Sequence, residues 1–264
     1  MKNLPLYASA ALGLFLAFGH PAQAQTIISA NFTGVFGSPD PGPSFVSFDQ
    51  KAGVIPAANF INADSFQNGQ ITGDAATDNT GAPVSGLSIS YNAGTEGVNS
   101  PTATTPNEQL LNGFIASSGT TAATTTISAL PAGFGTYDLY VYLANATPST
   151  GTYTYTAGTV VGGMFAPTGL AATQTAMAAT SITGPFTLAT ATTPGNYLEF
   201  TGLSASTFQL SAAGVAGNAP INGFQIVGPA SAAPEPSQVA ALGVTALGLA
   251  GLIFRARRRK ASAV

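Results

Sequence analysis

The side chains able to do acid–base or metal chemistry are few between Gln25 and Ala233. That stretch contains nine Asp and Glu residues, one Lys, and no His, Cys or Arg. Serine–histidine–aspartate and cysteine–histidine catalysis therefore lack their base there. Ordinary zinc sites and histidine–carboxylate iron sites lack their ligands. The chemistry that remains is that of carboxylates, aromatic rings and hydroxyl groups.

A glycoside hydrolase can be built on carboxylates alone, because two of them about 5–10 Å apart perform the acid–base work. The pool for such a pair is Glu96, Glu108, Asp138 and Glu199. No dinucleotide-binding, phosphate-loop or nucleophile-elbow motif accompanies it. We expect a protein that is not an enzyme, and we keep a carboxylate-based glycan hydrolase as an alternative.

A second candidate site lies on one predicted strand face. Asp138, Tyr140 and Tyr142 alternate with apolar residues, so a carboxylate and two rings share one side of the strand. Sugars stack on aromatic rings and donate hydroxyl hydrogen bonds to acids, so these residues suit glycan binding. The alternative is that both tyrosines only pack against a second layer of the fold.

Asp74 and Asp78 are the remaining metal candidates, in the turn-rich stretch GDAATDNTG. Oxygen ligands in a loop suit Ca²⁺, although the spacing does not match an EF-hand loop. Asp and Asn also make turns by accepting hydrogen bonds from their own backbone. We therefore expect no cofactor, with a structural Ca²⁺ as the alternative.

The elements that position these residues are predicted to be short strands separated by Gly, Pro, Asn and Thr clusters. Strands are expected at 26–32, 87–91, 136–143, 152–156, 197–200, 207–210 and 221–227, and a short helix at 108–115. This pattern favours an all-β fold, a jelly-roll or galactose-binding-like β-sandwich. The Thr- and Ala-rich stretches 120–126 and 171–180 are expected to be loops or edge strands, and a flat Thr/Ala face would suit ice binding.

Both ends of the chain are predicted to be targeting segments. Lys2 precedes the apolar run 12–18, and Ala22 and Ala24 fit a signal-peptidase site that leaves Gln25 first. Near the other end, the uncharged run 237–254 spans roughly 27 Å as a helix, close to the ~30 Å core of a bilayer. The basic residues that follow are expected to stay cytoplasmic; they are Arg255, Arg257, Arg258, Arg259 and Lys260.

The triplet Pro234-Glu235-Pro236, the apolar run and the Arg-rich end together resemble the PEP-CTERM sorting tail of Gram-negative bacteria. The resemblance implies processing near the triplet by an exosortase-type transpeptidase. The middle of the chain is similar to uncharacterised β-sandwich domains found ahead of such tails. The segments that carry this similarity are 52–63, 110–118, 130–144 and 219–227.

The predicted organisation is a signal peptide (1–24), an exported domain (25–228), a Pro-rich linker (229–236), a transmembrane helix (237–254) and a cytoplasmic tail (255–264). One Lys against nine acids gives residues 25–233 a net charge of −8, which disfavours nucleic acid as a partner. The expected partners are the Sec translocon, signal peptidase, an exosortase-type enzyme, the membrane and exopolysaccharide.

We expect a protein that passes through the inner membrane to the cell surface or extracellular matrix. Its predicted role there is structural or adhesive. The alternatives are a carbohydrate-binding module acting on exopolysaccharide, the glycan hydrolase and an ice-binding protein.

Overall fold

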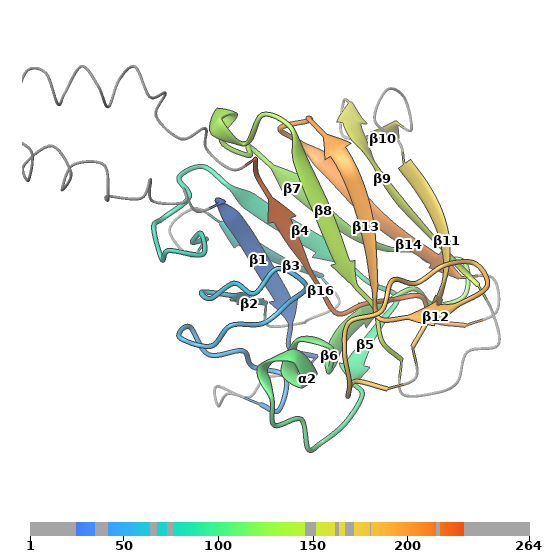
Figure 1. Ribbon diagram of the computed structural model, residues 1–264. Coiled ribbons are helices and arrows are strands. Elements are labelled where there is room, and N and C mark those ends of the chain that lie inside the picture. Colours follow the sequence, from blue (N-terminus) through green and yellow to red (C-terminus); the bar gives the residue numbers. More distant parts are fainter. Residues whose placement is uncertain are drawn as a thin grey trace, which may run out of the picture. The chain divides into compact units, whose positions relative to one another are not determined.

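Alternation of apolar and polar residues places one face of most strands against a shared core (Figure 1). The computed structural model describes residues 25–34, 42–63, 68–72, 76–145, 152–161, 164–166, 172–179, 181–214 and 217–229. Within these residues the fold is all-β, as the sequence predicts. Residues Gln25–Pro229 form one compact unit.

A five-stranded sheet carries both the first and the last strand of this unit. Its order is β13-β8-β16-β1-β2, and all neighbours are antiparallel except β1 and β2. The bounds are β1 Ile27–Phe32, β2 Ile61–Ala63, β8 Tyr137–Tyr142, β13 Tyr197–Leu203 and β16 Gly223–Val227. The central strand β16 therefore pairs with β1, the first strand of the unit, on one side and with β8 on the other.

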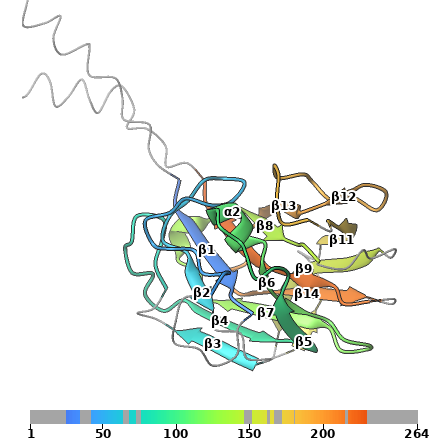
Figure 2. The same ribbon diagram turned by 90° about the horizontal axis from the view of Figure 1, so that it is seen from below.

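An eight-stranded sheet forms the second large layer (Figure 2). Its order is β12-β11-β9-β14-β7-β4-β3, with β10 paired to β9. The bounds are β3 Asn68–Thr72, β4 Ser88–Asn92, β7 Ala123–Ser128, β9 Tyr153–Val161, β10 Met164–Ala166, β11 Ala172–Ala178, β12 Pro194–Gly195 and β14 Phe208–Gly214. A small third sheet has the order β15-β6-β5, with β5 Thr95–Val98, β6 Gly113–Ala116 and β15 Pro220–Ile221.

The main core lies between the two large sheets. Leu139 and Val141 of β8 and Phe224 of β16 belong to the same buried cluster as Tyr155 of β9 and Leu210 of β14. On β8, Tyr137, Leu139 and Val141 point into this core while Asp138 and Tyr140 are only half-buried, so the predicted alternation is confirmed.

The helix expected at 108–115 is wrong in its second half. Helix α2 covers Pro106–Leu110, and Phe114 and Ile115 belong to strand β6 instead. Pro at the first helical position and a capping box between Thr105 and Glu108 fix the helix start early. The helix then ends because the residues that follow pair with β5 and β15. A 3-10 helix, η2, covers Ala132–Phe134.

The Thr-rich stretch 120–126 also departs from expectation. Residues 120–122 lie in a loop, as expected, but residues 123–126 belong to β7, an interior strand hydrogen-bonded to both β4 and β14. The stretch 171–180 supplies β11, which lies between β9 and the two-residue β12. Both stretches therefore belong to one sheet, although β14 and β9 separate them.

Several predicted segments lie outside the described residues. These are the signal peptide with Ala22 and Ala24, the triplet Pro234-Glu235-Pro236, the run 237–254 and the basic cluster 255–260. Gln25 is the first described residue. Among the described residues, none of the helices has the length and apolar character needed to cross a membrane.

Candidate functional site on the outer face of the five-stranded sheet

The side of the five-stranded sheet that faces away from the core brings aromatic rings and carboxylates together on β8 and β13. In the β8–β13 register, Tyr140 is opposite Glu199 and Tyr142 is opposite Tyr197. The ring centroids of Tyr140 and Tyr197 lie 6.3 Å apart. Because both strands are hydrogen-bonded along most of their length, the positions of these side chains are set by a rigid ladder.

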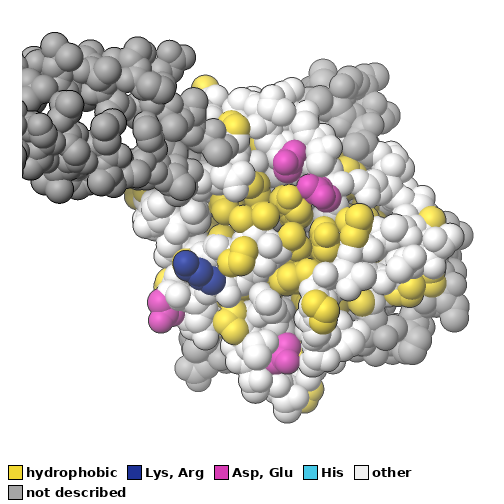
Figure 3. All heavy atoms as spheres, in the orientation of Figure 1, with side chains coloured by type: hydrophobic (Ala, Val, Ile, Leu, Met, Phe, Trp, Pro, Cys, Tyr) yellow, Lys and Arg dark blue, Asp and Glu magenta, His cyan; other side chains and the backbone are white. Residues whose placement is uncertain are grey.

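Two loops border these strands and supply further apolar side chains. Val54 comes from the loop before β2, and Ile182 and Phe186 come from the segment before β12; all three pack with Tyr140 and Tyr197 in one cluster. The ring of Phe186 lies 6.5 Å from that of Tyr197 at 86°, edge to face. We call Asp138, Tyr140, Phe186, Tyr197 and Glu199 the outer patch. Figure 3 shows two acidic side chains beside a hydrophobic area over β8 and β13.

Asparagine side chains hold the bordering loops in place. Asn62 of β2 both donates to and accepts from the backbone of Val46, at 2.9 and 3.0 Å. Asn196, just before β13, accepts from the Thr187 N–H at 2.7 Å and donates to the Pro185 carbonyl at 3.2 Å. An asparagine amide therefore ties each loop to a strand, the loop of Val46 to β2 and the segment before β12 to the start of β13.

Tyr140 is the polar centre of the outer patch. Burial raises the pKa of Tyr140 to about 12, and a hydrogen bond to the Glu199 carboxylate and the charges of Glu199 and Asp138 add to the increase. The phenol therefore stays protonated and donates to Glu199 at any ordinary pH. The ring remains half-buried, so part of it can meet a ligand.

One carboxylate oxygen of Asp138 bonds the backbone of the neighbouring strand. Its Oδ1 accepts a hydrogen bond from the Gly202 N–H at 2.9 Å, across an irregularity in the β8–β13 pairing after Phe200. Its second oxygen has no partner among the hydrogen bonds of the described residues, and Asp138 is half-buried. Asp138 thus offers one acceptor oxygen beside Tyr140.

Tyr142 has a different environment although it lies two residues from Tyr140 on the same strand face. It is fully buried, its hydroxyl donates to Oε1 of Gln225, and that hydroxyl accepts from the Val54 N–H at 2.8 Å. Gly53 (φ +98°) allows this arrangement, because a Cβ there would collide with Gln225 and Tyr142. In this structure Tyr142 anchors a loop and cannot touch a ligand at the surface.

The other carboxylates of the hydrolase pool lie elsewhere. Glu108 is engaged in the α2 capping box, where hydrogen bonds from Thr104 and Thr105 lower its pKa. Glu96 is on β5, opposite Ile115, with both carboxylate oxygens shielded from solvent and unpaired; burial raises its pKa. The fold brings only Asp138 and Glu199 of this pool onto one face of neighbouring strands.

Of the two calcium candidates, the structure describes only Asp78. Asp78 turns back on its own loop, where Oδ1 accepts from the Thr80 N–H at 2.8 Å, the Thr80 hydroxyl at 2.6 Å and the Ala82 N–H at 3.1 Å. This is the turn-capping arrangement that the sequence pattern favours over a calcium ligand at Asp78. Asp74 lies outside the described residues. Within the described ranges no three His, Cys, Asp or Glu side chains gather as a metal site.

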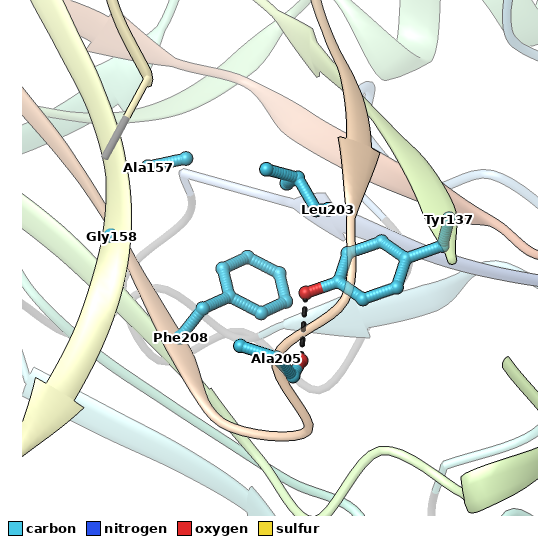
Figure 4. A pocket seen from close by; sticks show the side chains of 6 residues that line it. All are labelled: Tyr137, Ala157, Gly158, Leu203, Ala205 and Phe208. Atoms are coloured by element: carbon cyan, nitrogen blue, oxygen red, sulfur yellow. Dashed lines mark hydrogen bonds between the residues drawn. The ribbon is translucent and has the colours of Figure 1, made fainter. Parts of the chain in front are cut away.

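An apolar crevice opens at one end of the core (Figure 4). Tyr137, Leu203 and Ala205 from the five-stranded sheet side face Ala157, Gly158 and Phe208 from the other sheet. The Tyr137 hydroxyl donates to the Ala205 carbonyl at 2.8 Å, and burial raises its pKa well above the ordinary value. The crevice has no room for a water molecule, so we treat it as packing and not as a site.

Sequence reasoning missed two members of the outer patch, Tyr197 and Phe186. Tyr197 and Glu199 alternate with Leu198 and Phe200, and this period-two pattern could have placed Tyr197 on the same outward face as Glu199. Phe186 lies in a Pro- and Thr-rich segment with no strand pattern, so only the folded loop brings it to Tyr197.

The outer patch can stack a flat, apolar ring face and accept hydrogen bonds at its edge, which is the combination that pyranose rings require. No protein-family model, curated protein or solved structure matches the chain.

Proposed function

We propose that the chain is an exported, non-enzymatic adhesive protein of the cell surface or extracellular matrix, and that it holds polysaccharide through the outer patch. The observation that carries the proposal is the pairing of half-buried Tyr140 and Tyr197, 6.3 Å apart, with Glu199 as the cross-strand neighbour of Tyr140. The half-buried rings offer a surface on which a sugar can stack, and the carboxylates beside them offer acceptors for its hydroxyl groups.

The finer fold assignment is part of the same proposal. A jelly-roll or galactose-binding-like sandwich is supported by two large sheets around one core and by the pairing of β1 with β16 in the middle of one sheet. The open outer face of such a sheet offers a long polymer a surface to lie along.

Delivery to the surface rests on the two ends of the chain. We propose that the signal peptide exports the domain and that processing near Pro234-Glu235-Pro236 releases it from the tail. Replacing this triplet by three alanines should then block processing, so that the variant keeps its C-terminal tail and stays in the membrane fraction with the mass of the unprocessed chain. Normal processing of that variant would contradict sorting through the triplet.

The binding test compares two patch variants with a matched control in the full-length chain, purified in a non-ionic detergent. Tyr140→Ala and Tyr197→Ala should each weaken binding to neutral β-linked oligosaccharides by about tenfold, the usual cost of truncating a central aromatic contact. Phe48→Ala removes a ring that is 63% exposed outside the patch and should change nothing. Equal affinities for all four proteins would overturn the site.

A glycan hydrolase is the second candidate, favoured only by the placement of Asp138 and Glu199 on one face of neighbouring strands. If the unaltered chain hydrolyses any of the oligosaccharides tested for binding and Glu199→Gln abolishes this hydrolysis, the hydrolase assignment replaces the non-enzymatic one. The non-enzymatic proposal expects no turnover by the unaltered chain.

A further inference from the structure

The carboxylates of the outer patch form no ion pair with a basic side chain in the part of the chain that the structure describes. Lys51 is the one basic residue between Gln25 and Ala233, and no ion pair joins it to Asp138 or Glu199 within the described residues. Figure 3 shows the Lys side chain on the same face as the two acids but set apart from them. Two like charges on neighbouring strands repel each other, so a cation bound between them would relieve that repulsion.

The rings of the patch suit a cation as well. An ammonium over the face of a Tyr or Phe ring is attracted by its electron-rich face, and the attraction grows when the site is partly desolvated. Tyr140, Tyr197 and Phe186 supply three half-buried rings within one cluster. A neutral sugar stacks on the rings and donates hydroxyl hydrogen bonds to the carboxylates, whereas an amine-bearing sugar adds the attraction of its positive charge to both.

We propose that the outer patch selects polysaccharides with free amino groups, such as unacetylated glucosamine units, over neutral and acidic polymers. This inference rests on the proposed function and adds the charge class of the ligand. The pyranose ring lies on Tyr197, and its ammonium group lies between the free oxygen of Asp138 and the carboxylate of Glu199.

The charge of the whole domain acts in the same direction. A net charge of −8 over residues 25–233 draws a polycation toward the surface and repels polymers built from uronic acids. The attraction between exposed charges is screened by salt, with a Debye length of about 10 Å at 0.1 M. Selectivity for amines must therefore weaken as salt rises, while stacking of neutral sugars does not.

The experiment is calorimetric titration of the full-length chain in non-ionic detergent with three probes of equal length. The probes are a fully deacetylated glucosamine oligomer, its fully N-acetylated counterpart and a uronic acid oligomer. We expect the deacetylated oligomer to bind about five- to tenfold more tightly than the acetylated one at low salt, and the uronic acid oligomer not to bind.

Two isosteric variants and a control locate the effect. Glu199→Gln and Asp138→Asn should each reduce binding of the deacetylated oligomer about two- to fivefold and leave the acetylated oligomer unchanged. Asp49→Asn removes one exposed charge outside the patch and should leave both affinities unchanged. An equal loss in Asp49→Asn would show attraction by net charge alone and would overturn the inference.

The outcomes separate this inference from the proposed function. Equal binding of the acetylated and deacetylated oligomers would end the amine selectivity and leave glycan binding intact. Binding of neither oligomer would end both.

Discussion

The outer faces of the two large sheets differ although the same alternation builds the inner face of each. The eight-stranded sheet presents rows of uncharged polar side chains, and β3, β4, β7, β9, β11 and β14 contain no charged residue. One row across the strands is Asn92, Thr124, Ser211, Thr156 and Thr173. The five-stranded sheet instead carries acids, rings and two covering loops.

The comparison shows that the inward-facing residues of the alternating strands specify the core. The outward-facing residues decide whether each sheet faces solvent or is covered by loops. Hydroxyl groups on the eight-stranded sheet can remain hydrated, so nothing needs to cover them. On the five-stranded sheet, Tyr142 is covered by the two loops that carry Val54 and Phe186, and asparagine amides hold those loops in place. The outer patch is the strip that these loops leave half-open.

The largest expected effect comes from the amide that ties the five-stranded sheet to its surroundings. The buried Asn222 side chain donates to the carbonyls of Leu111 and Gly113 at 2.8 and 2.9 Å and accepts from the Ala144 N–H at 2.6 Å. Asn222→Ala should lower the free energy of unfolding by about 2–4 kcal/mol, because three buried backbone groups each lose a hydrogen bond, although the Leu111 carbonyl keeps the one from Asn99 at 2.9 Å. Urea denaturation measures it.

Asn92→Ala is the matched control on the other sheet, where the asparagine is exposed. Its effect should stay within about 0.5 kcal/mol. Equal destabilisation by Asn222→Ala and Asn92→Ala would contradict the claim that loops are anchored on the five-stranded sheet while the outer face of the eight-stranded sheet is uncovered.

Tyr142→Phe should cost about 1–2 kcal/mol of unfolding free energy. The substitution removes the hydroxyl that bonds both groups, which leaves the buried Gln225 side chain and the half-buried Val54 N–H without that partner. Tyr140→Phe is the comparison on the same strand face and should cost less, because its hydroxyl bonds a carboxylate near solvent. The reverse order would mean that Tyr140, and not Tyr142, anchors the fold.

Thr175→Lys tests the bare face of the eight-stranded sheet. Thr175 is exposed on β11, so a lysine there should change the free energy of unfolding by less than about 0.5 kcal/mol. Thermal denaturation of the two proteins at equal concentration is the measurement. A large loss would indicate that something covers this face in the folded protein.

The smallest expected effect is the pH dependence contributed by Glu96. Its pKa is raised in the folded state, so the native protein binds more protons than the unfolded chain between the ordinary glutamate pKa and the raised one. The free energy of unfolding must therefore fall as pH rises through that window. The stability associated with protonated Glu96 is fully present only below the window. Glu96→Gln should flatten this part of the profile and raise the denaturation midpoint slightly at pH 7. A steeper profile in the variant would contradict the assignment.

The sequence predicted the all-β class and the alternation on β8, because a period of two is visible in residues such as Leu139 and Val141. It could not separate Tyr140 from Tyr142, since both occupy the same face and the second one is buried by residues distant in the chain, such as Val54, Phe186 and Gln225. The same limit applies to Phe114 and Ile115, whose spacing fits a helix until β5 and β15 pair with them.

The most direct test of the central claim is to map where polysaccharide touches the chain. Footprinting of the full-length protein with and without a bound glucosamine polymer reports which side chains lose solvent access. The account predicts protection confined to Asp138, Tyr140, Phe186, Tyr197 and Glu199. Protection of β7, β14 and β9 on the hydroxyl face, with the outer patch unprotected, would contradict it.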